Sequence, residues 1–209
     1  MAHASAVIFD VGNVLYHWHP RNLYRRLIDD DQALEAFVRD VVNEEWHFQH
    51  DAGRSFSETA VELTERFPQH ADLITAWGPR FNESLSGPVD GMLDIVRELD
   101  AAGVPLFAIT NFSAEFFPPF RDTQAEIFDR FRDIVVSGEE RLVKPDPAIY
   151  RLALDRFGLT PQQAVFVDDN PANIAASSAM GIDSVLFTTA PAFRAHLVQV
   201  GLLVPVEAA

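Results

Sequence analysis

The sequence has no cysteine among its 209 residues. Disulfide bonds, thiolate catalysis and cysteine-ligated zinc are therefore excluded, and a reducing compartment suits the chain. It also has no run that approaches the roughly 20 apolar residues of a membrane span. The N-terminus, MAHASA, lacks the charged and apolar regions of a signal peptide. We expect a cytoplasmic protein with no membrane partner.

Positive charge is scarce as well. Sixteen lysine and arginine residues against 31 aspartate and glutamate residues give a formal net charge of −15. The resulting field repels nucleic-acid backbones and anionic membrane surfaces. An anionic small molecule can bind only where lysine, arginine, a helix N-terminus or a metal ion supplies local positive charge. We expect a small-molecule ligand, no nucleic-acid partner, and a monomer or a homodimer.

What the sequence does contain is a repeated alternation of short apolar runs and helical patterns. The apolar runs are AVIF (6–9), VPLFAI (104–109), DIVVS (133–137), AVFV (164–167) and DSVLF (183–187). Each is continuous rather than alternating, which indicates strands covered on both faces. Helical spacing leads up to Gly103 and to Gly158, both suitable as helix ends. The order of these segments predicts an α/β fold with a doubly wound parallel sheet.

One stretch interrupts this alternation. From about Pro20 to Ser86 there is no convincing strand, only helical segments such as NLYRRLIDDDQALEAFVRDVV and SETAVELTERF, the second opened by a capping-type serine, Ser57. A helical insertion of this size predicts a second, small domain formed by residues 16–86. Residues 1–15 and 87–209 would then form the core around the sheet.

Ligands of an open parallel sheet bind outside the carboxyl ends of its strands, so the residues that follow the apolar runs are candidate site residues. Polar groups of different chemical kinds follow four of the runs. In chain order, the residues at these positions are Asp10 with Gly12, Thr110 with Asn111, Lys144, and Asp168 with Asp169. Four such groups in a consistent order are hard to assign to chance.

Four segments, VIFDVGNVL, FAITN, VKPDPAIY and VFVDDNPANIAAS, resemble in this order the motifs of the haloacid dehalogenase (HAD) superfamily of aspartate-nucleophile hydrolases. The resemblance covers essentially the whole chain, and the helical insertion stands where subfamily IA has its small C1 cap domain. Together with WHFQHDAG, the motifs are most similar to the branch that contains the alpha-D-glucose-1-phosphate phosphatases.

The resemblance implies a nucleophile and a metal. Asp10 is expected to attack phosphorus and form an aspartyl-phosphate that water then hydrolyses. Asp10, the main-chain carbonyl of Gly12, and Asp169 with Asp168 beside it are expected to hold Mg²⁺, which prefers oxygen ligands. The three aspartates contribute three negative charges and Lys144 returns one positive charge, so a divalent cation would bring the sum to zero.

The resemblance also implies how phosphate is bound. Lys144 is expected to bridge the nucleophile and the phosphate. The hydroxyl of Thr110, with the main-chain N–H groups of Asn111 and Phe112, is expected to cradle phosphate oxygens. Thr110 and Lys144 would thus be catalytic together with Asp10.

Gly12 departs from the superfamily pattern. Most phosphatases of the superfamily have a second aspartate at this position, which protonates the leaving oxygen. His17 and His19 could replace that acid, or serve as hinge or packing residues. We expect Gly12→Asp to lower activity, because groups that have adapted to the glycine would clash with the new side chain or compete with it for the metal.

The cap is expected to select the substrate. Trp46, His47, Gln49 and Arg54 could stack on and hydrogen-bond to a sugar, although Trp46 could equally belong to the core of the cap. The favoured function is a Mg²⁺-dependent phosphatase of small phosphorylated metabolites, sugar phosphates first. The alternatives are a metal-independent 2-haloacid dehalogenase and a non-catalytic phosphate-binding protein that lacks the general acid.

Overall fold

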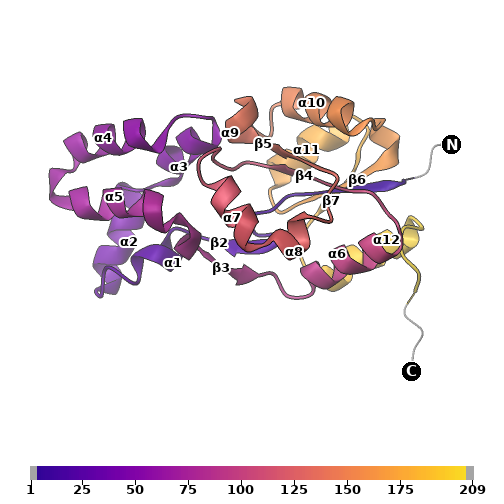
Figure 1. Ribbon diagram of the computed structural model, residues 1–209, viewed down its shortest axis with the longest axis horizontal. Coiled ribbons are helices and arrows are strands. Elements are labelled where there is room, and N and C mark those ends of the chain that lie inside the picture. Colours follow the sequence, from indigo (N-terminus) through magenta and orange to yellow (C-terminus); the bar gives the residue numbers. More distant parts are fainter. Residues whose placement is uncertain (1–3, 206–209) are drawn as a thin grey trace.

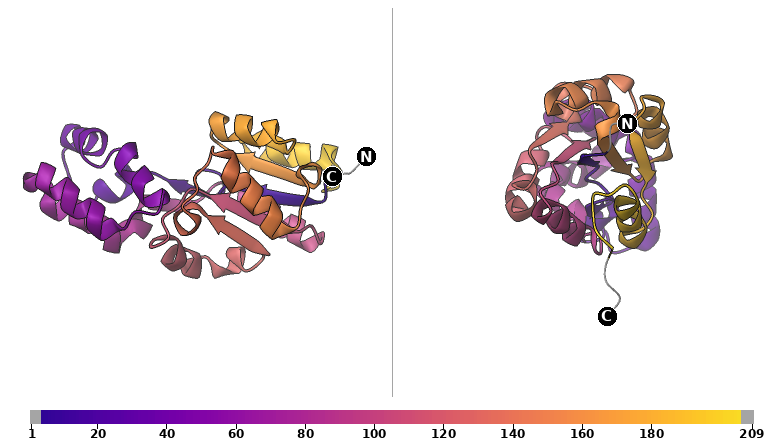
Figure 2. Two further views of the ribbon diagram at one scale, coloured as in Figure 1. Left: turned by 90° about the horizontal axis from the view of Figure 1, so that it is seen from above. Right: turned by 90° about the vertical axis from the view of Figure 1, so that its right-hand side faces the viewer.

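The computed structural model describes residues 4–205 of the chain. It consists of a core built on a parallel sheet and a group of helices from the first half of the chain, which lie next to each other along the longest axis (Figure 1). Seen from above, the helical part extends beyond one end of the sheet (Figure 2). This is the end at which the central strand β1 (Ala6–Phe9) finishes.

Five parallel strands form the core sheet in the order β5-β4-β1-β6-β7. Besides β1, they are β4 Leu106–Thr110, β5 Asp133–Val136, β6 Ala164–Asp168 and β7 Asp183–Leu186. They coincide with the predicted apolar runs, so the predicted fold class is confirmed. At the centre of the sheet, Phe9 pairs with Ala108 of β4 and Val167 of β6. Asp10 therefore leaves the sheet where the strand order reverses, which is the usual position of a ligand site in such sheets.

The helices of the core connect these strands. They are α6 Met92–Ala101, α7 Phe117–Thr123, α8 Ala125–Phe128, α9 Ser137–Glu140, α10 Pro147–Phe157, α11 Pro171–Ala179 and α12 Ala190–Gln199, with a 3-10 turn at Pro161–Gln163. α6 is followed by Gly103 and α10 by Gly158, as predicted, with φ angles of 75° and 67°. Glycine adopts this left-handed conformation without steric cost, which explains why the helices end there.

The two faces of β1 pack against different helices, because successive side chains of a strand point to opposite sides. Ala6 and Ile8 belong to an apolar cluster with α10, whereas Val7 and Phe9 belong to a second cluster with α6 and α12. All four side chains are fully buried. The continuous apolar character of the run is explained by this coverage of both faces.

Five helices form the part outside the sheet. They are α1 Arg21–Tyr24, α2 Asp31–Asp40, α3 Glu44–Asp51, α4 Phe56–Arg66 and α5 Ala71–Arg80, with 3-10 turns at Pro68–His70 and Phe81–Ser84. The buried rings of Tyr24 and Trp77 stack in its interior with centroids 5.8 Å apart. The N-cap of α4 is Ser55, whose Oγ accepts a hydrogen bond from the N–H of Glu58 at 3.3 Å, and the predicted Ser57 lies inside the helix.

A short antiparallel pair, β2 (Tyr16–Trp18) with β3 (Leu85–Pro88), joins the two parts and was not predicted. Strands of three and four residues, the second of which contains glycine and proline, give too weak a pattern to be recognised. We propose that this ribbon is the boundary between a core domain and a helical cap domain. Its two strands lie at the two ends of the expected cap, residues 16–86. Within residues 4–205, no helix is both long enough and apolar enough to cross a membrane.

Candidate active site

A buried lysine lies between two buried aspartates at the carboxyl ends of the central strands. Lys144 Nζ lies 2.9 Å from Asp10 Oδ1 and 2.6 Å from Asp168 Oδ2. Asp10 follows β1 and Asp168 ends the neighbouring β6, so parallel pairing brings the two carboxyls together. Burial favours the neutral amine of Lys144, but the two carboxylates outweigh it and raise its pKa above the usual value.

Asp168 has little free capacity for another ligand. Its carboxyl accepts hydrogen bonds from the main-chain N–H of Asn170 at 2.8 Å and from the side-chain amide of Asn173 at 2.9 and 3.0 Å, in addition to the contact with Lys144. The residue is wholly buried. Asp169, in contrast, is exposed at the same strand end. Asp168 is therefore placed to hold Lys144, and Asp169 is the more open of the two acids.

Three carboxyl groups are close enough to share one cation. One oxygen from each of Asp10, Asp168 and Asp169 lies within 4.8 Å of the other two. Burial raises the pKa of Asp10 to about 7, although the nearby Lys144 opposes the shift. The site thus holds more acid than one lysine neutralises, and all the donors are oxygen atoms. A divalent cation such as Mg²⁺ fits this set of ligands.

Thr110 ends β4, next to β1, and its hydroxyl is poised for a ligand. The side chain is 1% exposed, and its Oγ1 has no hydrogen-bond partner among residues 4–205. A buried hydroxyl left without a partner costs about 1–3 kcal/mol. A phosphate oxygen next to Thr110 would remove this cost.

The side-chain amide of Asn111 and the main-chain N–H of Phe112 form hydrogen bonds within the protein. The side-chain amide of Asn111 donates to the carbonyl oxygen of Lys144 at 3.0 Å, and its oxygen accepts from the N–H of Lys144 at 2.8 Å. The main-chain N–H of Phe112, predicted to contact phosphate, instead donates to Ser137 Oγ at 3.0 Å. Asn111 therefore fixes the backbone of Lys144, and Phe112 is tied to Ser137, the first residue of α9.

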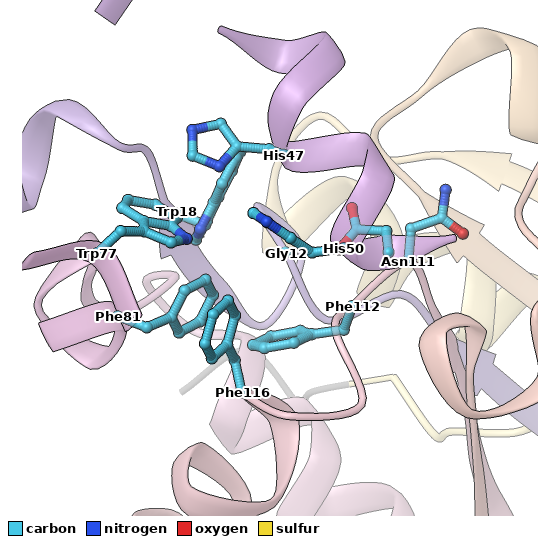
Figure 3. A pocket seen from close by; sticks show the side chains of 10 residues that line it. Gly12, Trp18, His47, His50, Trp77, Phe81, Asn111, Phe112 and Phe116 are labelled. Carbon is cyan, nitrogen blue, oxygen red and sulfur yellow. The ribbon is translucent and has the colours of Figure 1, made fainter. Parts of the chain in front are cut away.

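A cavity of about 80 Å³ lies between the strand ends and the helical part. Its lining consists of Gly12, Trp18, His47, His50, Asp51, Trp77, Phe81, Asn111, Phe112 and Phe116. Figure 3 shows the rings of Trp18, Trp77, Phe81, Phe112 and Phe116 gathered around it. Neither lysine nor arginine is among the lining residues. The cavity is therefore mainly aromatic, with its polar groups on α3 and on the loops after β1 and β4.

Of the four cap residues predicted to contact the substrate, His47 alone lines this cavity. Trp46 is buried inside the helical part. Arg54 pairs with Glu62 at 2.6 Å and donates to the side-chain oxygen of Gln49 at 2.5 Å, away from the cavity. Each residue of a helix is rotated about 100° from the one before it, so Trp46 and Gln49 on α3 point elsewhere than His47.

The two histidines considered as replacements for a general acid also lie outside the cavity. His17 and His19 are exposed, whereas Trp18 between them lines the cavity. This follows from the alternation of side chains along an extended segment. At Gly12, an added Cβ would meet no atom within 4 Å. The expected clash is therefore absent for that atom, and space beside Gly12 is open.

Several residues of the cavity had no predicted role. They are Trp18, His50, Asp51, Trp77, Phe81 and Phe116. His50 and Asp51 lie within the motif WHFQHDAG, one helical turn after His47, so helical spacing could have identified them. No local pattern marks Trp77 and Phe81. Trp77 lies on α5 and Phe81 begins the next 3-10 turn, and the ring of Phe81 reaches the cavity by packing on Phe112 and Phe116.

We predict that His47→Phe removes part of the protein's sensitivity to acid. Burial lowers the pKa of His47 to about 3, whereas an unfolded imidazole has a pKa near 6.5. Below about pH 6.5 the unfolded chain binds a proton that the folded chain does not, so His47 lowers stability as the pH falls. Phenylalanine keeps an aromatic ring at this position and has no titratable group.

The measurement is urea unfolding of both proteins at about pH 7.5 and about pH 5. Relative to the variant, the wild type should lose about 2 kcal/mol of unfolding free energy over this interval. Asp10 and Asp51, whose raised pKa values act in the opposite direction, are present in both proteins and cancel in the difference. A difference that does not change with pH would contradict a neutral, buried His47.

Comparison with known sequences finds a hydrolase family and several phosphatases to which this chain is similar. The profile of the haloacid dehalogenase-like hydrolase family matches residues 4–181. The chain is 27% identical over 184 residues to the sesquiterpene phosphatase astK of Aspergillus oryzae, with 85% of this chain and 87% of that protein covered. Four further curated relatives are longer, and the chain spans only 17% to 52% of their lengths.

Solved structures share the fold. A HAD-like family hydrolase from Porphyromonas gingivalis matches with a TM-score of 0.71 and 20% identity, over 94% of this chain and 98% of that chain. A HAD family enzyme from Bacteroides thetaiotaomicron, in complex with magnesium and inorganic phosphate, matches with a TM-score of 0.65 and 19% identity, over 89% and 95%. At these identities the likeness extends to the fold alone.

Proposed function

The chain belongs to the haloacid dehalogenase-like hydrolase family, and we propose that it is a Mg²⁺-dependent phosphatase of small phosphorylated metabolites. The observation that carries the proposal is the buried arrangement of Asp10, Lys144 and Asp168, with the hydroxyl of Thr110 on the adjacent strand, which has no partner within the described range 4–205. This arrangement combines a carboxylate nucleophile with a cation and a hydrogen-bond donor suited to an anion.

In the proposed reaction, a carboxylate oxygen of Asp10 attacks phosphorus and the bond to the leaving oxygen breaks. Lys144 Nζ, 2.9 Å from Asp10, offsets negative charge on the transferring phosphoryl group. The hydroxyl of Thr110 donates to one of its oxygens. Water then attacks phosphorus and releases phosphate from Asp10. Asp168 keeps Lys144 in place throughout.

We propose that Asp10 and Asp169 hold Mg²⁺ together with the main-chain carbonyl of Gly12, with Asp168 at the edge of the site. The close approach of the three carboxyls and the excess of acid over lysine support this assignment. When bound, the ion supplies positive charge that lets a phosphate dianion approach the carboxylates. A relative in fold from Bacteroides thetaiotaomicron was solved with magnesium and phosphate.

The cavity supports a substrate whose organic part is uncharged and has an apolar face. Aromatic rings form most of its lining, and no lysine or arginine is present to pair with a carboxylate. Sugar phosphates meet this description, since the C–H face of a sugar packs on aromatic rings. A cavity of roughly 150 Å³ is known to hold a benzene ring, whereas this cavity measures about 80 Å³, so a sugar ring would require the cap to move away from the core. The resemblance to the alpha-D-glucose-1-phosphate phosphatases belongs to the same proposal, because their substrate is a sugar phosphate.

Two other functions are less well supported. A 2-haloacid dehalogenase must bind the carboxylate of its substrate, and besides Lys144, which already contacts Asp10 and Asp168, the lining of the cavity adds no lysine or arginine for this purpose. It also needs no metal, so it gives no reason for the acid cluster of Asp10, Asp168 and Asp169. A non-catalytic phosphate-binding protein would keep the same anion site but would show no turnover.

One release assay separates the three functions. We predict that the wild type releases phosphate from uncharged sugar and short-chain alkyl phosphates in Mg²⁺, and that excess chelator abolishes the release. It should release no halide from 2-haloacids. Halide release that persists in chelator would favour the dehalogenase, and phosphate binding without any release would favour the binding protein.

A further inference from the structure

Cleavage of a phosphate ester of an alcohol requires a proton at the leaving oxygen, because an alkoxide is a poor leaving group. The proton donor must lie on the side of the phosphorus away from the nucleophile, where the cavity begins. Three of the residues that line the cavity carry titratable side chains: His47, His50 and Asp51. All three lie on α3, and Figure 3 shows His47 and His50 directed from this helix toward the aromatic rings.

The two histidines are poor donors in this position. Burial lowers the pKa of His47 to about 3 and that of His50 to about 4, so both rings are neutral at neutral pH. His50 Nε2 is also engaged with Thr59 Oγ1 at 2.6 Å within the helical part. The carboxyl of Asp51 is the remaining titratable group of the cavity.

The backbone of Asp51 is held firmly against the core. Its carbonyl oxygen accepts a hydrogen bond from Ser137 Oγ at 2.6 Å, and the same hydroxyl accepts the N–H of Phe112 at 3.0 Å. In the following turn, a Cβ added to Gly53 would lie 2.9 Å from the carbonyl oxygen of Gly138, and Gly53 has a φ of 90°. Only glycine fits so close an approach, so the turn fixes the end of α3 next to the strand ends.

The carboxyl of Asp51 itself is uncommitted. Within residues 4–205 it forms no ion pair and no side-chain hydrogen bond, whereas Asp10 and Asp168 are held by Lys144. Burial raises the pKa of Asp51 to about 7, the negative charge of Asp10 adds to the shift, and Lys144 opposes it. A carboxylic acid with such a pKa can give up and regain a proton near neutral pH.

We propose that Asp51, supplied by the cap, is the general acid and base of the reaction and occupies the role that Gly12 cannot fill. The inference rests on the proposed phosphatase function. As Asp10 attacks phosphorus, the bond to the leaving oxygen breaks and its electron pair stays on that oxygen, which takes the proton of Asp51 and departs as an alcohol. The Asp51 carboxylate then accepts a proton from the water that attacks phosphorus, and the bond between phosphorus and Asp10 breaks.

The test compares two esters in Asp51→Asn. On an alkyl phosphate that the wild type hydrolyses, the variant should lose about 10²–10⁴-fold in kcat/KM. On p-nitrophenyl phosphate, whose phenolate leaves without a proton, it should lose less than about tenfold. Retained activity on the aryl ester shows in the same assay that the variant is folded. Glu45→Gln, an exposed acid on the same helix, is the matched control and should match the wild type on both esters.

An equal loss on both esters, or no loss on the alkyl ester, would overturn the role of Asp51. Asp10→Asn is measured in parallel to separate this failure from failure of the proposed function. If Asp10→Asn is inactive while Asp51→Asn treats both esters alike, Asp10 remains the nucleophile and Asp51 is not the acid. If Asp10→Asn hydrolyses both esters like the wild type, Asp10 is not the nucleophile. If the wild type itself hydrolyses neither ester in Mg²⁺, the proposed function is wrong.

Discussion

Asp10→Asn is expected to abolish phosphate release, with kcat falling by about 10⁴–10⁶-fold. An amide oxygen is a poor nucleophile and cannot form the aspartyl-phosphate. Folding should be retained, because burial already makes the charged form of Asp10 costly and Lys144 keeps its second partner, Asp168, at 2.6 Å. Steady-state phosphate release and thermal unfolding, measured on the same preparation, separate chemistry from folding.

Asp72→Asn is a suitable control, since Asp72 is an exposed residue of α5 outside the site. It should behave as the wild type in both measurements. A folded Asp10→Asn protein that keeps more than about one hundredth of the wild-type kcat would contradict a nucleophilic role for this residue.

The second large effect concerns the two neighbouring aspartates after β6. Asp169→Asn should weaken Mg²⁺ binding by at least about 100-fold. Mutation of a residue that only hydrogen-bonds to a metal ligand already costs about 10–100-fold in metal affinity, and loss of a ligand should cost more. At a Mg²⁺ concentration that is just sufficient for the wild type, phosphate release by Asp169→Asn should nearly vanish. Asp168→Asn should affect Mg²⁺ binding less, since its carboxyl is occupied by Lys144, Asn170 and Asn173. It should instead lower the free energy of unfolding by about 2 kcal/mol, the value of a hydrogen bond to a charged group.

Titration calorimetry with Mg²⁺ and urea unfolding without the ion distinguish these two outcomes. The two substitutions are chemically identical and lie at adjacent positions, so each serves as the control for the other. Equal Mg²⁺ affinity in Asp169→Asn and in the wild type would exclude Asp169 as a ligand. A larger loss of affinity in Asp168→Asn would reverse the assigned roles.

The sheet could be predicted because its three central strands, β4, β1 and β6, are covered on both faces. Ala6 and Ile8 face one set of helices, and Val7 and Phe9 face the other, so the run had to be continuously apolar. Once the strands were recognised, the candidate site residues could be located, because parallel strands bring the residues that follow them to one edge of the sheet. Their functional roles came from the resemblance and stay predictions. The β2-β3 ribbon could not be predicted, because its strands are too short to show an alternation of apolar and polar residues.

The contacts of the helical part could not be predicted, because its helices bury side chains against one another and against the core at the same time. On α3, Trp46 is buried among the helices outside the sheet and His47 faces the cavity, yet both are aromatic and adjacent. The C-terminal end of α3 is held to the core by the hydrogen bond from Ser137 Oγ to the carbonyl oxygen of Asp51, which joins residues 86 positions apart in the sequence. Such a contact leaves no local signal.

The central claim is that Asp10 carries the phosphoryl group between the two half-reactions. The most direct test is mass spectrometry of the wild type mixed with excess substrate and Mg²⁺, quenched in acid during turnover and digested. The peptide that contains Asp10 should gain the mass of one phosphoryl group, and the gain should be absent in chelator and in Asp10→Asn. Rapid phosphate release without any phosphorylated peptide, or a phosphoryl group on another residue, would contradict the account.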